Sequence, residues 1–231
     1  MTAPPPPRVA VVLVAAGSGT RVGAGTNKVL LPLLGVPVLA WSLRTATSLA
    51  YVDHVVVVAR EADVTAVHDL VERYLPEGRE AAVVTGGPTR HASEWRGLSV
   101  LRSRSEAGDL DVVAVHDGAR PLADAELFEA VCRSAHAHGG ALPMRPQPGL
   151  VTADGRRHVT GLVGVQTPHA FRAGPLLDAY RRAEADGYTG TDTAGCVTAY
   201  TDLPVHAVPG PATNLKVTFA EDLALAERLL G

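Results

Sequence analysis

Four short apolar runs constrain the fold of this 231-residue chain more than any other feature. They stay apolar along almost their whole length instead of alternating with polar residues, and they are rich in valine. Their sequences are VAVVLV at 9–14, HVVVVA at 54–59, AAVVT at 81–85 and DVVAVH at 111–116. Strands that are buried on both faces of a parallel sheet have this continuous apolar character. The runs therefore predict a parallel sheet that is covered on both sides.

Segments with helix-like patterns lie between and after these runs, near 37–49, 61–74, 91–104 and 123–138. Asp124 marks a helix start, because an apolar period through Leu127 and Phe128 follows it. A further strand near 204–208 and a closing helix near 219–230 complete the pattern. This alternation predicts a three-layer, Rossmann-like α/β fold, with a mostly parallel, twisted sheet and helices on both faces.

The composition fits one domain over residues 9–231, with two smaller domains as the less favoured alternative. Apolar residues make up 46% of the chain and charged residues 19%, which allows a sizeable core. The net charge of −3 and the lack of a long basic block argue against nucleic acid as a partner. The lead at 1–8, MTAPPPPR, is rich in proline and has no apolar signal core, so it is expected to be disordered.

The remaining compositional signals indicate a protein of the cytoplasm. No apolar run reaches membrane-spanning length, so no membrane partner is expected. Cys132 and Cys196 lie far apart, which argues against a disulfide framework or a zinc site. The nine histidines show no metal-ligand spacing, and His116 is interpreted as structural.

One stretch, 143–168, interrupts the alternation of strands and helices. It is rich in proline, glycine and arginine, and a DG pair at 154–155 favours a turn between short β-like runs. It predicts a projecting β-arm over about 145–166. An arm of this kind in a small α/β domain often embraces a second subunit, so a homodimer through the arm is expected.

The loop AAGSGTRVGAGTNK, at 15–28, follows the first strand and contains four glycines. It is not a Walker A motif, because Lys28 stands in the context NKV rather than GKS or GKT. It is not a clean dinucleotide fingerprint either, because Val22 stands where the third glycine belongs. Its small residues would let backbone N–H groups approach a polyphosphate, and Arg21 and Lys28 would add two cations. A glycine turn with two solvated cations is the alternative.

The loop and several later segments resemble a known family. AAGSGTR at 15–21, Lys28 and LPLLGVPVL at 31–39 are similar to the signature of sugar-nucleotide pyrophosphorylases and related nucleotidyltransferases. Further segments agree in order and spacing: GGPTRHASEWRGL at 86–98, VHDGARP at 115–121, QTPHAF at 166–171, TDTAG at 191–195 and NLKVTFAEDL at 214–223. Within that superfamily, the chain most resembles the 2-C-methyl-D-erythritol 4-phosphate cytidylyltransferases. The glycine loop and VHDGARP carry most of the resemblance.

The resemblance implies an enzyme of the non-mevalonate isoprenoid route. Such an enzyme joins CMP from CTP to a polyol phosphate, here most suitably 2-C-methyl-D-erythritol 4-phosphate, and releases pyrophosphate. The reaction needs two anions held together and charge stabilised at the α-phosphate. The resemblance assigns Arg21 and Lys28 to the transition state and Lys216 to the attacking phosphate. It also implies Mg²⁺ or another divalent cation, with Asp117 as the candidate ligand.

The resemblance further implies two sets of binding residues. The nucleotide would be bound by Ala15, Ala16, Gly17, Gly19, Gly86, Gly87, Ser93 and Asp117. The acceptor would be bound by Asp117, Arg120, Thr167, Thr191 and Lys216. Each has a purely structural alternative. Gly86 and Gly87 could simply end a strand, Asp117 and Arg120 could form a turn pair, the two threonines could cap loops, and Lys216 could be a surface lysine.

Two regions depart from the family pattern. Pro88 stands where the family often has an acid and where a backbone N–H is available, so strictness for cytosine is in doubt. In the arm, Pro146 and Gln147 replace an Asp-Thr pair, and Val159 replaces the arginine that would clamp the acceptor phosphate. Two nearby arginines, Arg156 and Arg157, could compensate.

The altered arm keeps two other functions open. A paralogue could transfer CMP to a different polyol phosphate, such as ribitol 5-phosphate. A non-catalytic protein could retain the fold and bind a nucleotide. Retention of Arg21, Lys28, Asp117, Arg120 and Lys216 together argues against the second of these, because a binding protein would not need all five.

Overall fold

The computed structural model describes residues 7–17 and 27–231. Within these residues, one sheet of eight strands has the order β10-β7-β9-β6-β1-β4-β5, and β8 pairs with β7 beside this path. The strands are β1 (Val9–Ala15), β4 (Val52–Ala59), β5 (Ala81–Thr85), β6 (Val112–Asp117), β7 (Gly140–Pro146), β8 (Val163–Val165), β9 (His169–Arg172) and β10 (Val205–Pro209). A separate small hairpin consists of β2 (Pro32–Leu33) and β3 (Val36–Pro37).

The four apolar runs form the parallel half of the sheet. Strand β1 pairs in parallel with both β4 and β6, and β4 pairs in parallel with β5. In the other half, β9 runs antiparallel to its neighbours β6 and β7, while β7 and β10 are parallel to each other. The predicted three-layer, mostly parallel fold is therefore confirmed, with β8 and β9 as the antiparallel strands that make the sheet mixed.

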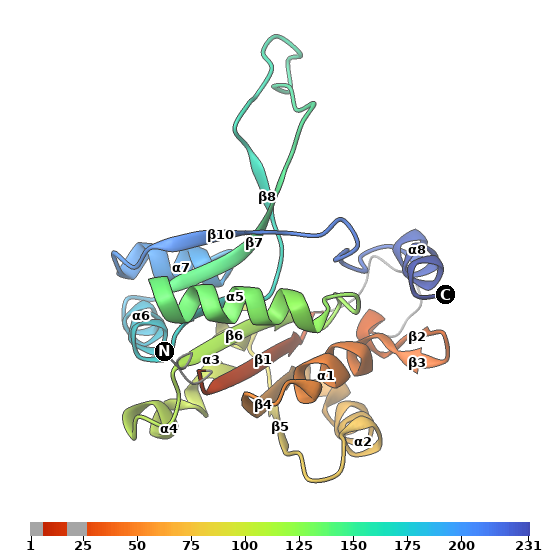
Figure 1. Ribbon diagram of the computed structural model, residues 1–231, viewed down its shortest axis with the longest axis vertical. Coiled ribbons are helices and arrows are strands. Elements are labelled where there is room, and N and C mark those ends of the chain that lie inside the picture. The colour runs from red at the N-terminus through yellow and green to blue at the C-terminus, as the bar shows by residue number, and fades with distance from the viewer. Residues whose placement is uncertain (1–6, 18–26) are drawn as a thin grey trace, which may run out of the picture.

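Helices cover both faces of the sheet (Figure 1). Their bounds are α1 (Val38–Ser48), α2 (Val64–Tyr74), α3 (Arg90–Ser99), α4 (Arg102–Glu106), α5 (Ala125–His138), α6 (Ala173–Ala185), α7 (Thr193–Tyr200) and α8 (Ala220–Leu230). Helices α1, α2 and α5 contribute to one buried cluster, and α3, α6 and α7 contribute to a second. Two short 3₁₀ turns are η2 (Lys28–Leu30) and η3 (Glu61–Asp63).

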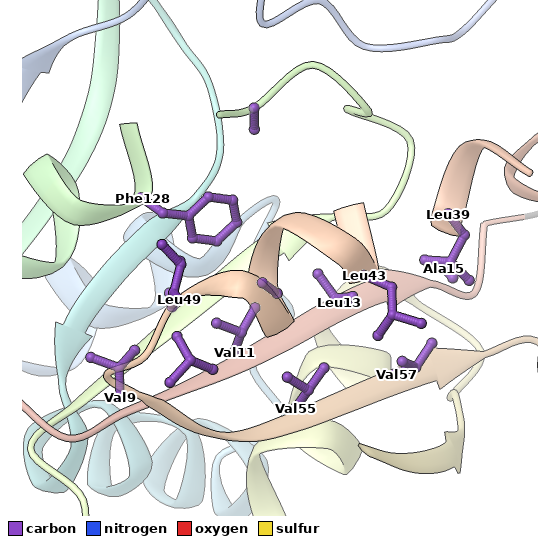
Figure 2. Close-up of a cluster of buried hydrophobic side chains, with 14 of the residues drawn as sticks. Val9, Val11, Leu13, Ala15, Leu39, Leu43, Leu49, Val55, Val57 and Phe128 are labelled. Carbon is purple, nitrogen blue, oxygen red and sulfur yellow. The ribbon is translucent and has the colours of Figure 1, made fainter. Parts of the chain in front are cut away.

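Strand β1 shows why these runs are apolar at every position. Val9, Val11 and Leu13 belong to the cluster under α1 and α5, together with Phe128 (Figure 2). Their neighbours Ala10 and Val12 point to the opposite face and belong to the cluster under α3 and α6. Because successive side chains of a strand point to opposite faces, a central strand between two helical layers needs apolar residues at both.

Some helix boundaries differ from the prediction. The helix expected over 91–104 is two helices, α3 and α4, and the buried Leu101 lies between them. The helix near 123–138 begins as predicted, with the Asp124 side chain accepting a hydrogen bond from the N–H of Leu127 at 2.8 Å. Helices α6 and α7 and strands β7 and β9 were not predicted from the apolar pattern, because their apolar stretches are short or interrupted by proline.

The arm projects from the sheet as a hairpin, as expected (Figure 1). It leaves β7 at Pro146 and returns through β8, and a single bridge joins Val151 to His158 near the tip. Gly155 has a φ of +71°, a conformation that glycine adopts without steric cost, so it completes the DG turn.

Arg8, which the prediction placed in the lead, is held to the sheet by hydrogen bonds. Residues 1–6 of the expected lead lie outside the described residues. Arg8 is fixed to the start of β6, because its backbone N–H and its guanidinium donate to the Asp111 carboxylate at 2.8 and 3.1 Å. In the described part of the chain, no helix is long and apolar enough to cross a membrane. Cys132 and Cys196 are buried free thiols in opposite cores.

Candidate active site

A cavity of about 550 Å³ opens where the parallel strands β1, β4, β5 and β6 end. Ligands of open α/β sheets bind at these carboxyl ends, because the loops there converge from several strands. The cavity wall contains eight of the residues that the sequence assigned to a site. They are Ala15, Ala16, Gly17, Lys28, Gly87, Ser93, Asp117 and Lys216.

Asp117 is the centre of the charged groups on this wall. It ends β6, is buried, and pairs with Arg90 (Nη1 to Oδ1, 2.6 Å) and with Lys216 (Nζ to Oδ2, 2.8 Å). Arg120 lies behind it, with Nε 3.7 Å from Oδ2. Burial alone would raise the pKa of Asp117, but these three cations outweigh burial and hold the pKa well below its usual range. The carboxylate is therefore ionised at neutral pH.

Lys216 reaches this site because its segment is bound to the loop after β6. The N–H of Val217 donates to the carbonyl of Ala119 at 2.8 Å. The Arg120 guanidinium donates to the carbonyl of Asn214 at 2.7 Å. Asn214, which is fully buried, donates through its side chain to the carbonyl of Thr167 at 2.9 Å. Three segments that are far apart in sequence are thus joined around Asp117.

His116 and Thr167 support the same loop from inside the protein. His116 Nε2 lies 3.2 Å from the carbonyl of Arg120, which can only accept, so Nε2 carries the proton. Nδ1 is then the acceptor for the Thr167 hydroxyl at 3.2 Å, and that hydroxyl accepts the N–H of Asp117 at 3.0 Å. Burial lowers the pKa of His116 to about 4, which keeps it neutral. His116 is thus structural, as expected.

Lys28 is held at the wall by a buried polar group. The preceding residue, Asn27, donates to the carbonyl of Ala15 at 3.1 Å and to the Asp63 carboxylate at 2.8 Å. Its side-chain oxygen also accepts the N–H of Val29, which starts the turn η2 that contains Lys28. Asp63 in turn binds Arg60 through two hydrogen bonds of 2.9 and 3.0 Å. The loop after β1 and the end of β4 are thereby tied together.

The two glycines after β5 permit a close approach of chain segments. A Cβ on Gly86 would lie 2.6 Å from the Cβ of Ala16, and one on Gly87 would lie 2.5 Å from the Cβ of Ala92. Their N–H groups are used internally: Gly86 donates to the carbonyl of Ala59 and Gly87 to the Ser93 hydroxyl. Ser93 is buried and reaches the wall, where Pro88 also lies. The glycines therefore shape the wall through their lack of side chains.

The other predicted residues lie off the described wall. Arg21 and Gly19 lie outside the described residues, and Gly86 lies just behind the wall. Thr167 is buried with its hydroxyl engaged by His116 and Asp117, which is the capping role that was its alternative. Thr191 is exposed in the loop before α7. Arg120 supports Asp117 and Asn214 instead of facing the cavity.

Sequence reasoning missed two arginines of the wall and one buried acid. Arg60 follows β4, where parallel strands present ligand groups, and this position could have identified it. Arg90 begins α3, whereas the predicted helix began one residue later. Glu94 stands four residues after Arg90 in the same helix, a spacing that predicts a pair. Arg90 meets Asp117 only in the folded chain, and no local sequence pattern indicates that contact.

The charge of the wall favours a polyanion. The charged side chains described on it are Lys28, Arg60, Arg90 and Lys216, against Asp117, which gives a formal charge of 4 − 1 = +3. Lys28 and Lys216 are also the only lysines in a chain with 21 basic residues. A lysine ammonium is a compact, mobile point charge, whereas an arginine is a rigid fork, so the two are not interchangeable at a reacting phosphate. Both lysines lie on the wall of this cavity.

Comparisons with known proteins cover nearly the whole chain. The family model described as 2-C-methyl-D-erythritol 4-phosphate cytidylyltransferase matches residues 9–231. A relative of that name from Symbiobacterium thermophilum is 39% identical over 96% of this chain and 92% of its own length. A bifunctional enzyme IspD/IspF from Clavibacter michiganensis is 40% identical over 97% of this chain, which spans 55% of that longer protein.

Solved structures agree with these relatives. A 2-C-methyl-D-erythritol 4-phosphate cytidylyltransferase from Thermus thermophilus is 32% identical and superimposes with a TM-score of 0.73, covering 94% of this chain and 97% of that one. A 4-diphosphocytidyl-2C-methyl-D-erythritol synthase from Anaerococcus prevotii has a TM-score of 0.80 at 25% identity, covering 96% of this chain and 97% of that one. The likeness therefore extends over nearly the whole length of both chains.

Proposed function

Because this chain belongs to the 2-C-methyl-D-erythritol 4-phosphate cytidylyltransferase family, we propose that its Asp117 cavity carries out the reaction of that family. The enzyme transfers CMP from CTP to 2-C-methyl-D-erythritol 4-phosphate and releases pyrophosphate, a step of isoprenoid synthesis. One observation supports assigning the reaction to this cavity. A buried carboxylate sits between Arg90 and Lys216 on a wall of charge +3, where a triphosphate and a phosphate can meet.

The chemistry is an in-line displacement at the α-phosphorus of CTP. A phosphate oxygen of the acceptor forms a new P–O bond, and the bond from the α-phosphorus to the bridging β-phosphate oxygen breaks. Pyrophosphate leaves with the electron pair. Because two anions must approach each other, fixed cations supply most of the catalysis. Lys28 would stabilise charge at the α-phosphate, together with Arg21, which lies outside the described residues.

Lys216 would orient the attacking phosphate. Its ammonium lies 2.8 Å from Asp117 Oδ2, so the carboxylate fixes the ammonium at the cavity wall before substrate arrives. The side chain is 35% exposed and can contact a ligand without leaving Asp117. Positioning of this kind turns an encounter between two bound anions into an intramolecular step.

A divalent cation would be shared between the substrate phosphates and Asp117, in place of one of the ion pairs that Asp117 makes with Arg90 and Lys216. Asp117 is the one carboxylate among the described wall residues, and the described chain contains no cluster of three or more acids, histidines or cysteines suited to a metal. Mg²⁺ commonly binds through one or two carboxylates while substrate phosphates provide further ligands. Asp117 would hold the ion, which when bound neutralises charge on the phosphates.

The arm is proposed to complete the acceptor site of a second subunit in a homodimer. Its apolar side chains are exposed, as an interface would need: Leu150, Val151, Leu162, Val163 and Val165. Arg156 at its tip is 84% exposed and its pair with Asp154 is long, at 4.0 Å. Arg156 and Arg157 would therefore be available to clamp the acceptor phosphate in the partner's cavity, in place of the arginine that Val159 replaces.

A different polyol phosphate, such as ribitol 5-phosphate, is the second candidate acceptor. The N–H of Val159 donates to the carbonyl of Leu150 at 2.8 Å, so this position is part of the hairpin and presents an apolar side chain. If Arg156 or Arg157 binds the acceptor phosphate, the cation lies at a different place on the hairpin from position 159. Such an acceptor site could select a polyol of another length. The enzyme is expected to work in the cytoplasm, where CTP and free thiols such as Cys132 and Cys196 both persist.

A pyrophosphate-release assay tests these proposals. The full chain is incubated with each of the four nucleoside triphosphates and a panel of polyol phosphates, with Mg²⁺. We expect the largest kcat/KM with CTP and 2-C-methyl-D-erythritol 4-phosphate. Turnover confined to ribitol 5-phosphate would favour the second acceptor. Binding of CTP without turnover on any acceptor would overturn the enzymatic proposal.

A further inference from the structure

A fully buried carboxylate, Glu94, lies behind the cavity in α3. One of its oxygens accepts a hydrogen bond from Arg90 Nε at 2.8 Å, and the other accepts from the hydroxyl of Tyr180 in α6. A buried ionised carboxylate is costly unless it is paired and hydrogen-bonded. Both oxygens of Glu94 therefore have a partner, and one of these partners reaches the active site.

Arg90 connects this buried acid to the cavity. Its Nε faces Glu94, its Nη1 lies 2.6 Å from Asp117 Oδ1, and its side chain is 28% exposed at the wall. A guanidinium is a planar, rigid fork, so two carboxylates that bind different nitrogens fix both its position and its plane. Arg90 thus stands between Glu94 on the core side and Asp117 on the ligand side.

Tyr180 and His91 fix the far end of this chain of contacts. The ring of His91 stacks on the ring of Tyr180 at 4.7 Å with planes 10° apart, and both residues are buried. The phenol ring is therefore held while its hydroxyl donates to Glu94. Burial raises the pKa of Glu94 above its usual range, and Arg90 and Tyr180 only partly oppose that rise. Arg90 therefore stabilises the ionised form of Glu94, and Glu94 in turn fixes the position of Arg90.

We propose that Glu94 is a positioning residue for nucleotide binding, which acts through Arg90 on Asp117. With Glu94 in place, the guanidinium is held at the cavity wall with its Nη1 on Asp117, where CTP would meet it. Without the carboxylate, Arg90 has one anchor instead of two and samples other rotamers, so Asp117 loses its shortest ion pair. The role of Glu94 rests on the proposed function, because that function makes CTP the ligand.

The test measures CTP binding by calorimetry with the full chain, alongside kcat and KM. We expect Glu94→Gln to weaken CTP binding on the order of tenfold, the loss typical of one charge-assisted hydrogen bond. KM for CTP should rise by a similar factor, with kcat changed less than about threefold, because the cations proposed for the transition state remain. Glu129→Gln is the matched control. It removes an exposed Arg–Glu pair of the same i, i+4 spacing in α5 and should leave CTP binding unchanged.

A double-mutant cycle distinguishes positioning from a general structural role. In an Arg90→Gln background, Glu94→Gln should have almost no further effect on CTP binding, because the residue through which Glu94 acts is gone. The proposal is overturned if Glu94→Gln weakens CTP binding equally in both backgrounds. It is also overturned if the single variant is folded and binds CTP as the unaltered protein does.

Tyr180→Phe keeps the proposal testable if Glu94→Gln does not fold. It retains the pair between Arg90 and Glu94 but removes the hydrogen bond to the second oxygen. We expect a weaker loss of CTP affinity, about threefold, that again vanishes in the Arg90→Gln background. An equal loss in both backgrounds would overturn the role of Glu94. Because the readout is CTP binding, failure of pyrophosphate release would refute the enzymatic function without affecting this result.

Discussion

The Asp117 cavity and the arm differ in how far the chain itself fixes their side chains. Around the cavity, Asp117 is buried with ion pairs of 2.6 and 2.8 Å, and its loop is held by His116 and Thr167. Along the arm, apolar side chains are exposed, and Arg156 is 84% exposed with a pair of 4.0 Å. The cavity is preorganised within one chain, whereas the arm would gain its contacts from another molecule in the proposed homodimer. The proposal therefore separates a nucleotide half from an acceptor half.

The largest effect should come from the cavity side of this comparison. Lys28→Ala should lower kcat about 10³-fold, because a fixed cation at the α-phosphate acts mainly in the transition state. Steady-state kinetics and a circular dichroism spectrum measure the change and check the fold. Arg133→Ala, which removes an exposed cation from α5, is the control and should leave kcat unchanged. A kcat within threefold of the unaltered protein would contradict the role given to Lys28.

Acid should destabilise the cavity half and spare the arm. Burial lowers the pKa of both His116 and His169 to about 4, below the unfolded value of about 6.5. Between these values the unfolded state binds more protons, so the free energy of unfolding falls as pH falls from 6.5 towards 4. The slope is on the order of 1 kcal/mol per pH unit for each histidine.

Urea unfolding at several pH values measures this slope. His158→Gln provides the comparison within the arm, because His158 is exposed there, and it should leave the slope unaltered. A free energy of unfolding that stays constant or increases from pH 6.5 to pH 5 would show that proton uptake by these histidines does not dominate the pH dependence, since the raised pKa of Glu94 acts in the opposite direction.

The arm side is tested by its two tip arginines. Arg156→Gln combined with Arg157→Gln should raise KM for the acceptor phosphate on the order of tenfold, because charge-assisted phosphate contacts are lost. The dissociation constant for CTP should stay within twofold, since the nucleotide half lies within the other region. Arg181→Gln, at an exposed Arg–Asp pair in α6, is the matched control. An unchanged KM for the acceptor, or a change confined to CTP binding, would break the division into two halves.

The smallest expected effect is the protection of the two lysines from chemical labelling when CTP is bound, and its measurement needs no mutation. Lys28 and Lys216 are the only lysines, so an amine-selective reagent has three targets, counting the N-terminal amine. CTP at ten times its dissociation constant should slow labelling of both lysines about tenfold by mass action. Labelling of the urea-unfolded protein with and without CTP is the control and should proceed at the same rate in both. Peptide mass spectrometry resolves the sites, and equal labelling of the lysines with and without CTP would place the nucleotide elsewhere.

Local sequence determined the parallel half of the fold and part of the site. The runs at 9–14, 54–59 and 111–116 became inner strands because residues there must be apolar to be buried on one face or the other, whereas the run at 81–85 became the edge strand β5, which is only partly buried. Lys28 and Asp117 lie at the ends or loops of those strands, so the strand pattern also predicted the edge at which they meet. The DG turn likewise predicted the arm.

Tertiary structure alone decided which groups touch Asp117. Arg90 is 27 residues away in the chain and Lys216 is 99, and neither distance leaves a periodic signal in the sequence. The same is true of Thr167, whose hydroxyl turns inward to His116 instead of towards a ligand. Apolar periodicity reports which face of an element is buried, because burial acts on every residue of that face. A single ion pair or hydrogen bond between distant segments depends on the register and packing of the whole sheet, and only the folded chain specifies it.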